Sequence, residues 1–169
     1  MKTMILIAGL VSTIGLEGQI LAIGTKYSTP DDFSVNANFN FPYNPDNAGE
    51  ELDEGLFFGA DYSLSLNNSD ESFRGLKLTP LAYQKKIISS DRSRMGVYLG
   101  AESSYLFNSG KGKDGVVLSP YVKILSGNNH IFSLKTGYEY NTSDGNNQVF
   151  AQLNIDLFAV FLDSLHMKF

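Results

Sequence analysis

Alternation of apolar and polar residues is the clearest pattern along the chain, and it is strongest near the C-terminal end. From Val149 to Phe169 every second residue is apolar except Asp163. The positions between them include polar side chains: Gln152, Asn154, Asp156, Ser164, His166 and Lys168. Because successive side chains of a β-strand point to opposite faces, this pattern predicts one strand over 149–169 with an apolar face and a polar face.

The same period of two recurs in seven earlier segments, which are separated by polar, turn-rich clusters. The predicted strands are 19–27, 33–41, 55–66, 72–88, 94–107, 115–125 and 130–141. In the strand 72–88, Leu76, Leu78 and Ala82 are assigned to the apolar face, and Pro80 predicts a bulge or a local change of register. No segment shows the period expected of a helix with one apolar face.

Two faces of this kind fit a barrel with lipid outside and a polar lumen inside. We therefore predict an all-β fold, an eight-stranded antiparallel up-and-down transmembrane β-barrel with a plugged polar lumen. An even number of strands allows both chain ends to lie in the periplasm. The connections 28–32, 67–71, 108–115 and 142–147 would then lie outside the cell, and 42–54, 89–93 and 126–129 would be periplasmic turns.

The first residues have the composition of a secretory signal peptide. Lys2 supplies a positive start, 4–14 is apolar, and 15–18 forms a short polar end. The apolar run is shorter than the roughly 20 residues that a membrane-spanning helix needs. We predict a signal peptide over 1–18 and the barrel over 19–169; the alternative is a buried first strand or helix.

Composition narrows the partners more than it defines the fold. A net charge of −5 and a pI near 4.9 argue against nucleic acid, which needs clustered Lys and Arg. The absence of cysteine excludes disulfides, thiolate metal sites and a cysteine nucleophile. At 169 residues the chain supports one domain, and its 43% hydrophobic residues are ordinary because barrel strands turn only alternate residues to lipid.

The polar face of the predicted barrel carries charges of both signs. They are Lys26, Asp61, Lys77, Glu102, Lys123, Lys135, Glu139 and Asp156. An eight-stranded barrel is only wide enough inside for its own side chains, and buried charges persist when they are paired. We therefore predict an ion-pair network that plugs the lumen; the alternative is a narrow gated path for ions or protons.

With this patterning, the chain resembles the small eight-stranded outer-membrane barrels of the OmpA-transmembrane and OmpX type. The segments PLAYQKKI (80–87) and GVYLGAESSYLF (96–107) also resemble those of porin-family barrels from Bacteroidota. Phe169 is similar to the aromatic end of the β-signal that the barrel-assembly machinery reads during insertion. The resemblance implies a location in the cell outer membrane, contact with its lipid, and partner membrane proteins as candidates.

The sequence shows no catalytic constellation, so we predict no enzyme, no cofactor and no metal site. His130 and His166 are interpreted as residues at strand ends, without the serine and acid that a lipid hydrolase would need. The acidic residues Asp46, Glu50, Glu51, Asp53 and Glu54 lack EF-hand spacing and are interpreted as a solvated loop, with weak Ca²⁺ binding as the alternative. Lys111 and Lys113 are assigned to a flexible hairpin loop, the alternative being contact with lipopolysaccharide phosphates.

Three functions remain open at this level. The first is an integral outer-membrane barrel with a structural or interaction role, for example as an accessory subunit of an envelope complex, and without an open pore. The second is an outer-membrane enzyme that modifies lipid. The third is a soluble lipocalin-like barrel that binds a ligand, in which the apolar face would point inward.

Overall fold

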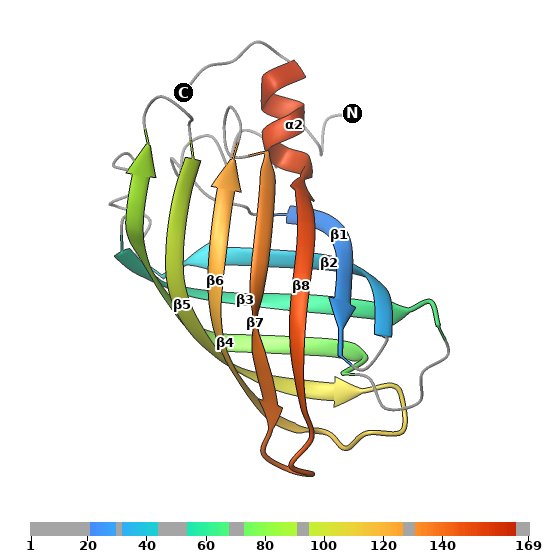
Figure 1. Ribbon diagram of the computed structural model, residues 1–169. Coiled ribbons are helices and arrows are strands. Elements are labelled where there is room, and N and C mark those ends of the chain that lie inside the picture. Colours follow the sequence, from blue (N-terminus) through green and yellow to red (C-terminus); the bar gives the residue numbers. More distant parts are fainter. Residues whose placement is uncertain are drawn as a thin grey trace.

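Eight antiparallel strands form a closed barrel in which each strand pairs with its neighbour in sequence and β1 pairs with β8 (Figure 1). The computed structural model describes residues 21–29, 32–43, 54–67, 73–90, 95–126 and 131–164. The strands are β1 Leu21–Ser28, β2 Asp32–Pro42, β3 Glu54–Ser65, β4 Gly75–Ser90, β5 Met95–Asn108, β6 Gly115–Ser126, β7 Phe132–Asn141 and β8 Asn147–Asp156. The predicted up-and-down topology and strand number are confirmed.

The strands are strongly tilted, as a barrel this small requires. In Figure 1, β6, β7 and β8 cross in front of β2, β3 and β4 at a steep angle. The two ends of the barrel differ. One end, here called the α2 end, carries a short helix, α2 Leu157–Ser164, beyond β8; the other, the loop end, carries the β5–β6 and β7–β8 hairpin connections.

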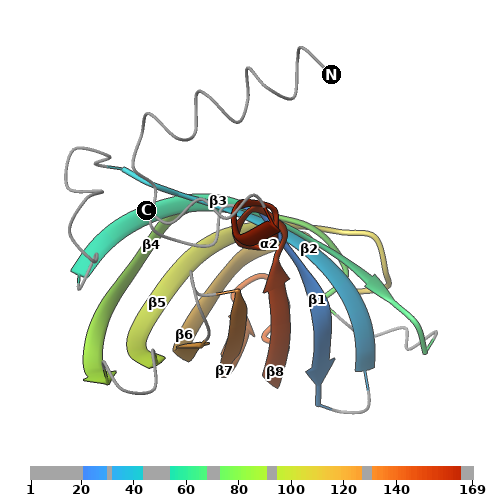
Figure 2. The ribbon, with the colours of Figure 1, turned by 90° about the horizontal axis from the view of Figure 1, so that it is seen from above.

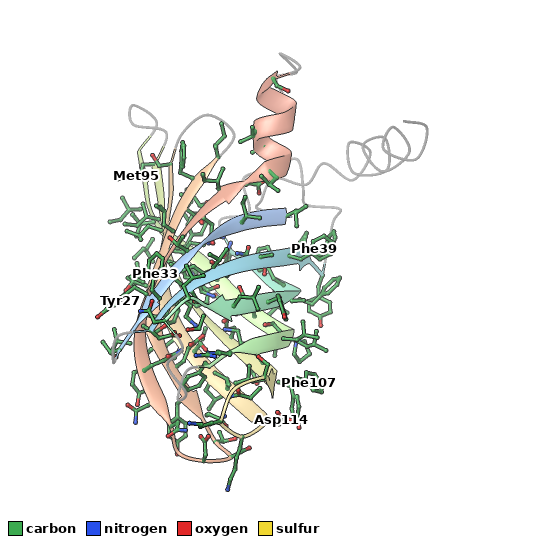
Figure 3. The ribbon with its side chains drawn as sticks, turned by 90° about the vertical axis from the view of Figure 1, so that its right-hand side faces the viewer. Tyr27, Phe33, Phe39, Met95, Phe107 and Asp114 are labelled. Atoms are coloured by element: carbon green, nitrogen blue, oxygen red, sulfur yellow. The ribbon has the colours of Figure 1, made fainter. Side chains whose placement is uncertain are left out.

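The barrel is apolar outside and polar inside. Along β8 the side chains alternate between exposed and buried, so Leu153 is 53% exposed whereas Asn154 is 3% exposed. The same alternation runs along β2, where Phe33 and Phe39 lie on the outer surface (Figure 3). Most of the fully buried side chains are polar. The predicted distribution of the two faces is confirmed.

The predicted end of the last strand is wrong. β8 stops at Asp156, and 157–164 form the eight-residue helix α2, which extends from the end of the barrel (Figures 1 and 2). The Asp156 carboxylate accepts a hydrogen bond from the Ala159 N–H at 2.9 Å, as an N-cap does. From Leu157 to Leu162 every residue is apolar, so a continued strand would have to place apolar side chains on its polar face. None of the described helices is long and apolar enough to span a bilayer.

The predicted irregularity at Pro80 is present, and it overturns one side-chain assignment. The pairing of β4 with β5 shifts between Leu78 and Leu81, on either side of Pro80. Leu81 is therefore 50% exposed and Ala82 only 6% exposed. Ala82 was predicted on the outer face, and it lies inside because the bulge reverses the parity of the strand after Pro80.

Gly24 allows the closing pair of strands to approach closely. It pairs with Asn154 across the β1–β8 seam. A Cβ atom at Gly24 would collide with the Leu153 carbonyl and with the amide oxygen of the Asn154 side chain. The absence of a side chain here lets Asn154 extend across β1 into the lumen.

Candidate functional site in the lumen

A chain of alternating charges crosses the lumen. The Lys26 ammonium lies 2.6 Å from Oε2 of Glu139, and the Lys77 ammonium lies 2.7 Å from the other oxygen, Oε1. Lys77 also reaches Oε1 of Glu102 at 3.1 Å, and Lys135 lies 2.7 Å from Glu102 Oε2. The five side chains come from β1, β7, β4 and β5, so the ion pairs join strands on opposite sides of the barrel.

These charges are almost completely removed from solvent. The side chain of Glu139 is 1% exposed and that of Lys26 is 6% exposed. Aromatic rings cover the lysines, because the Lys26 ammonium lies 4.9 Å from the centre of the Phe150 ring and that of Lys135 lies 4.3 Å from the Tyr121 ring. Gln148 donates a further hydrogen bond to Glu139. Each glutamate thus has cationic donors for both of its oxygens.

The other predicted lumen residues lie outside this chain of ion pairs. Asp61 faces the lumen beside Lys77, but the hydrogen bonds that it accepts come from Asn36 and Ser63, both at 3.4 Å. Asp156 is buried and caps α2. Lys123 is inward-facing and partly exposed, and no described carboxylate lies within ion-pair distance of it. Phe169 is outside the described residues.

A layer of amides, which the sequence analysis did not identify as a network, lies beside the ion pairs. The side-chain oxygen of Asn154 accepts hydrogen bonds from Asn36 at 3.2 Å, from Asn38 at 3.1 Å and from Gln152 at 3.1 Å, and its nitrogen donates to Ser133 at 3.3 Å. The available signal was the clustering of Asn and Gln on the polar faces of β2 and β8, the two strands that pair with β1. These bonds connect β1's two neighbours across the seam.

Polar groups on the outer surface of β4 interact with Tyr43, just beyond β2, and with Glu54 of β3. The Tyr43 hydroxyl donates a hydrogen bond to the carbonyl of Pro80 at the β4 bulge. Near the α2 end, Lys85 lies 2.9 Å from Glu54, which also accepts a hydrogen bond from Tyr83. Of the acidic cluster at 46–54, Glu54 alone falls within the described residues.

The β5–β6 connection at the loop end is bonded to its neighbour. The Asp114 carboxylate accepts a hydrogen bond from the Asn108 N–H at 2.7 Å, and Asp144 of the β7–β8 connection accepts one from the Lys113 N–H at 3.2 Å. Asn141 donates to the Lys113 carbonyl at 2.9 Å. Figure 3 labels Asp114 in this region. The loop that contains Lys111 and Lys113, predicted as flexible, is therefore held by side-chain hydrogen bonds.

The described residues contain no cluster of metal-ligating side chains. Within these ranges no three His, Cys, Asp or Glu side chains gather as they would around a metal ion. The two histidines, His130 and His166, both lie outside the described residues.

Comparison with known proteins adds no further information, because no family model matches the chain and neither a similar curated protein nor a similar solved structure was found.

Proposed function

We propose that the protein is an integral outer-membrane β-barrel of the OmpA-transmembrane or OmpX type, with a structural or interaction role and without an open pore. The observation that carries this proposal is the inverted distribution of polarity around a closed barrel. Large apolar side chains such as Leu64, Leu99 and Val149 are more than half exposed, whereas Lys26 and Glu139 are buried. Contact of these apolar side chains with water would be unfavourable, whereas contact with lipid hydrocarbon would not be.

The contents of the lumen favour this function over a lipocalin-like one. A soluble barrel that binds an apolar ligand would need an apolar interior, but here the interior contains ion pairs and amides. The same side chains support the absence of an open pore, because the ion pairs between Lys26, Glu139, Lys77, Glu102 and Lys135 cross the lumen. No arrangement among the described residues favours the lipid-modifying enzyme.

The test of membrane insertion is electrophoretic mobility before and after boiling, after expression in a Gram-negative host and separation of its membranes. We expect the protein in the outer-membrane fraction, with a faster band in unboiled detergent samples than in boiled ones, because the closed barrel resists unfolding. Protein that stays soluble in plain buffer and shows no change of mobility would contradict the proposal.

The interaction role is tested separately, by purifying the tagged protein from its own membrane in mild detergent and determining the mass and composition of the particle. A heavy particle of defined composition would make the barrel a subunit of an envelope complex, with partner membrane proteins. A lone barrel would leave lipid as its lasting partner, after transient contact with the barrel-assembly machinery during insertion.

A further inference from the structure

The pairing of the strands places four lysines on one continuous row around the barrel wall. Across β4, β5, β6, β7, β8 and β1, successive partners are Lys86, Tyr98, Lys123, Lys135, Gln152 and Lys26. Tyr98, Gln152 and Lys26 are buried, so this row faces the lumen. Lys123 and Lys135 are direct cross-strand partners, and like charges in this position repel each other.

Lys123 differs from the other lysines of the lumen. The ammonium groups of Lys26 and Lys135 each contact a glutamate, at 2.6 and 2.7 Å. No carboxylate or hydrogen-bond acceptor among the described residues lies within bonding distance of the Lys123 ammonium. Asp156, the buried carboxylate at the end of β8, accepts a hydrogen bond from the α2 backbone and attracts Lys123 without forming an ion pair with it. Asp156 and Glu102 act on the charge of Lys123 only from beyond ion-pair distance, so its repulsion from Lys135 is not offset by a direct ion pair.

Lys123 also lies near the α2 end of the lumen. It lies three residues before Ser126, the last residue of β6, which is about 10 Å along a strand. Its side chain is partly exposed, whereas Lys26 and Lys77 are buried. An anion that enters from the α2 end would thus meet Lys123 and its partner Lys135 before it reached Glu139, which lies further along β7.

We propose that the α2 end of the lumen binds a small oxyanion, of which inorganic phosphate is the simplest, with Lys123 as its principal ligand and Lys135 as its neighbour. Lysine binds phosphate as a point charge with several donors. The bound anion supplies the direct ion-pair partner that Lys123 lacks among the described residues. This site depends on the fold and not on the membrane location, so its test is independent of the proposed function.

The experiment is calorimetric titration of inorganic phosphate into the full-length protein, folded in nonionic detergent, with ionic strength held constant by chloride. We expect one phosphate per barrel, and a Kd weaker by about tenfold or more in Lys123→Gln, because a charge-assisted hydrogen bond is lost. Lys113→Gln, at the loop end, is the matched control and should bind as the unchanged protein does. Far-UV circular dichroism checks that both variants are folded.

Two results would overturn the site. The first is an absence of phosphate binding to the unchanged protein, and the second is equal binding by Lys123→Gln. A further variant, Asp46→Asn with Glu50→Gln, Glu51→Gln and Asp53→Asn, distinguishes a free anion from a carboxylate of this chain. If phosphate binds only after these four charges are removed, the anion on Lys123 is the chain's own, and the proposal of a free oxyanion is wrong.

Discussion

At the scale of the residue, Glu139 holds the lumen together because it pairs with two lysines from different strands. Both carboxylate oxygens contact an ammonium, and the side chain is 1% exposed. Removal of one partner from a buried ion pair leaves an uncompensated charge and costs about 3–5 kcal/mol. We expect Glu139→Gln to lower the free energy of unfolding by that order, measured by urea denaturation of the protein in lipid vesicles.

The control for Glu139→Gln is Glu54→Gln, which breaks the ion pair with Lys85 on the outer surface. Both side chains of that pair are more than half exposed, and Glu54 begins β3 at the α2 end, where the proposed membrane position places the pair at the interface with water, so its loss should change the unfolding midpoint little. The double variant Glu139→Gln with Lys26→Met should recover part of the lost stability, because it removes Lys26, whose carboxylate partner is lost, whereas Lys77 keeps Glu102. A loss as large for Glu54→Gln as for Glu139→Gln would show that Glu139 has no special role.

The alternation along each strand predicted which side chains lie inside the barrel, but it did not predict which of them form ion pairs with each other. Lys77 and Glu139 were both expected inside because each sits on the polar face of its strand. That Lys77 on β4 contacts Glu139 on β7 depends on the stagger of the strands and on how far each side chain reaches across the lumen. The same limit explains why Lys123, expected in the ion-pair network, has no described carboxylate partner.

At the scale of the element, the β4 bulge leaves the Pro80 carbonyl without a partner in the strand pairing, and the Tyr43 hydroxyl donates a hydrogen bond to it. Pro80 has no N–H, and the break in pairing beside it leaves its carbonyl on the outer face, where the Tyr43 hydroxyl donates to it. In lipid no water can replace that bond. We expect Tyr43→Phe to destabilise the barrel by about 1 kcal/mol in vesicles, measured by urea denaturation.

Tyr62→Phe is the matched control for the bulge. Tyr62 is an exposed tyrosine on the outer face of β3, and no hydrogen bond of its hydroxyl is found among the described residues. Its substitution should leave the stability unchanged. Equal effects of the two substitutions would mean that the bond from Tyr43 to Pro80 does not stabilise the bulge.

Strand boundaries were predictable where apolar and polar residues alternate without interruption, and the predictions were wrong where the alternation breaks down. The start of β4, expected at 72, is observed at Gly75, and the bulge was signalled by Pro80 alone. The prediction for the last strand was wrong because all residues of 157–162 are apolar. Alternation there cannot distinguish a strand from a helix. The Asp156 cap and the end of pairing with β1 at Ala22 decide for α2.

At the scale of the whole molecule, the closed barrel follows from the sequence because eight alternating segments leave no other way to separate two such faces. What the sequence could not show was how the seam between β1 and β8 closes. Gly24 admits the Asn154 side chain, which then binds amides from β2 and β8. The bond between Asn36 and Asn154 joins β2 to β8 across the seam, and alternation within single strands contains no information about it.

The nature of the solvent around the barrel is a property of the whole molecule, and one substitution tests it. Ala151 is exposed on the outer face of β8, midway between the outward positions Asn147 and Ile155, and it faces the small residue Thr136 on β7. In a bilayer, Ala151→Arg places a charge near the midplane and costs about 2–4 kcal/mol, whereas Asn147→Arg at the loop end costs much less. In water both would be surface substitutions with effects within about 0.5 kcal/mol. Urea denaturation in vesicles should therefore separate the two variants; equal stabilities would mean that the outer face does not meet lipid.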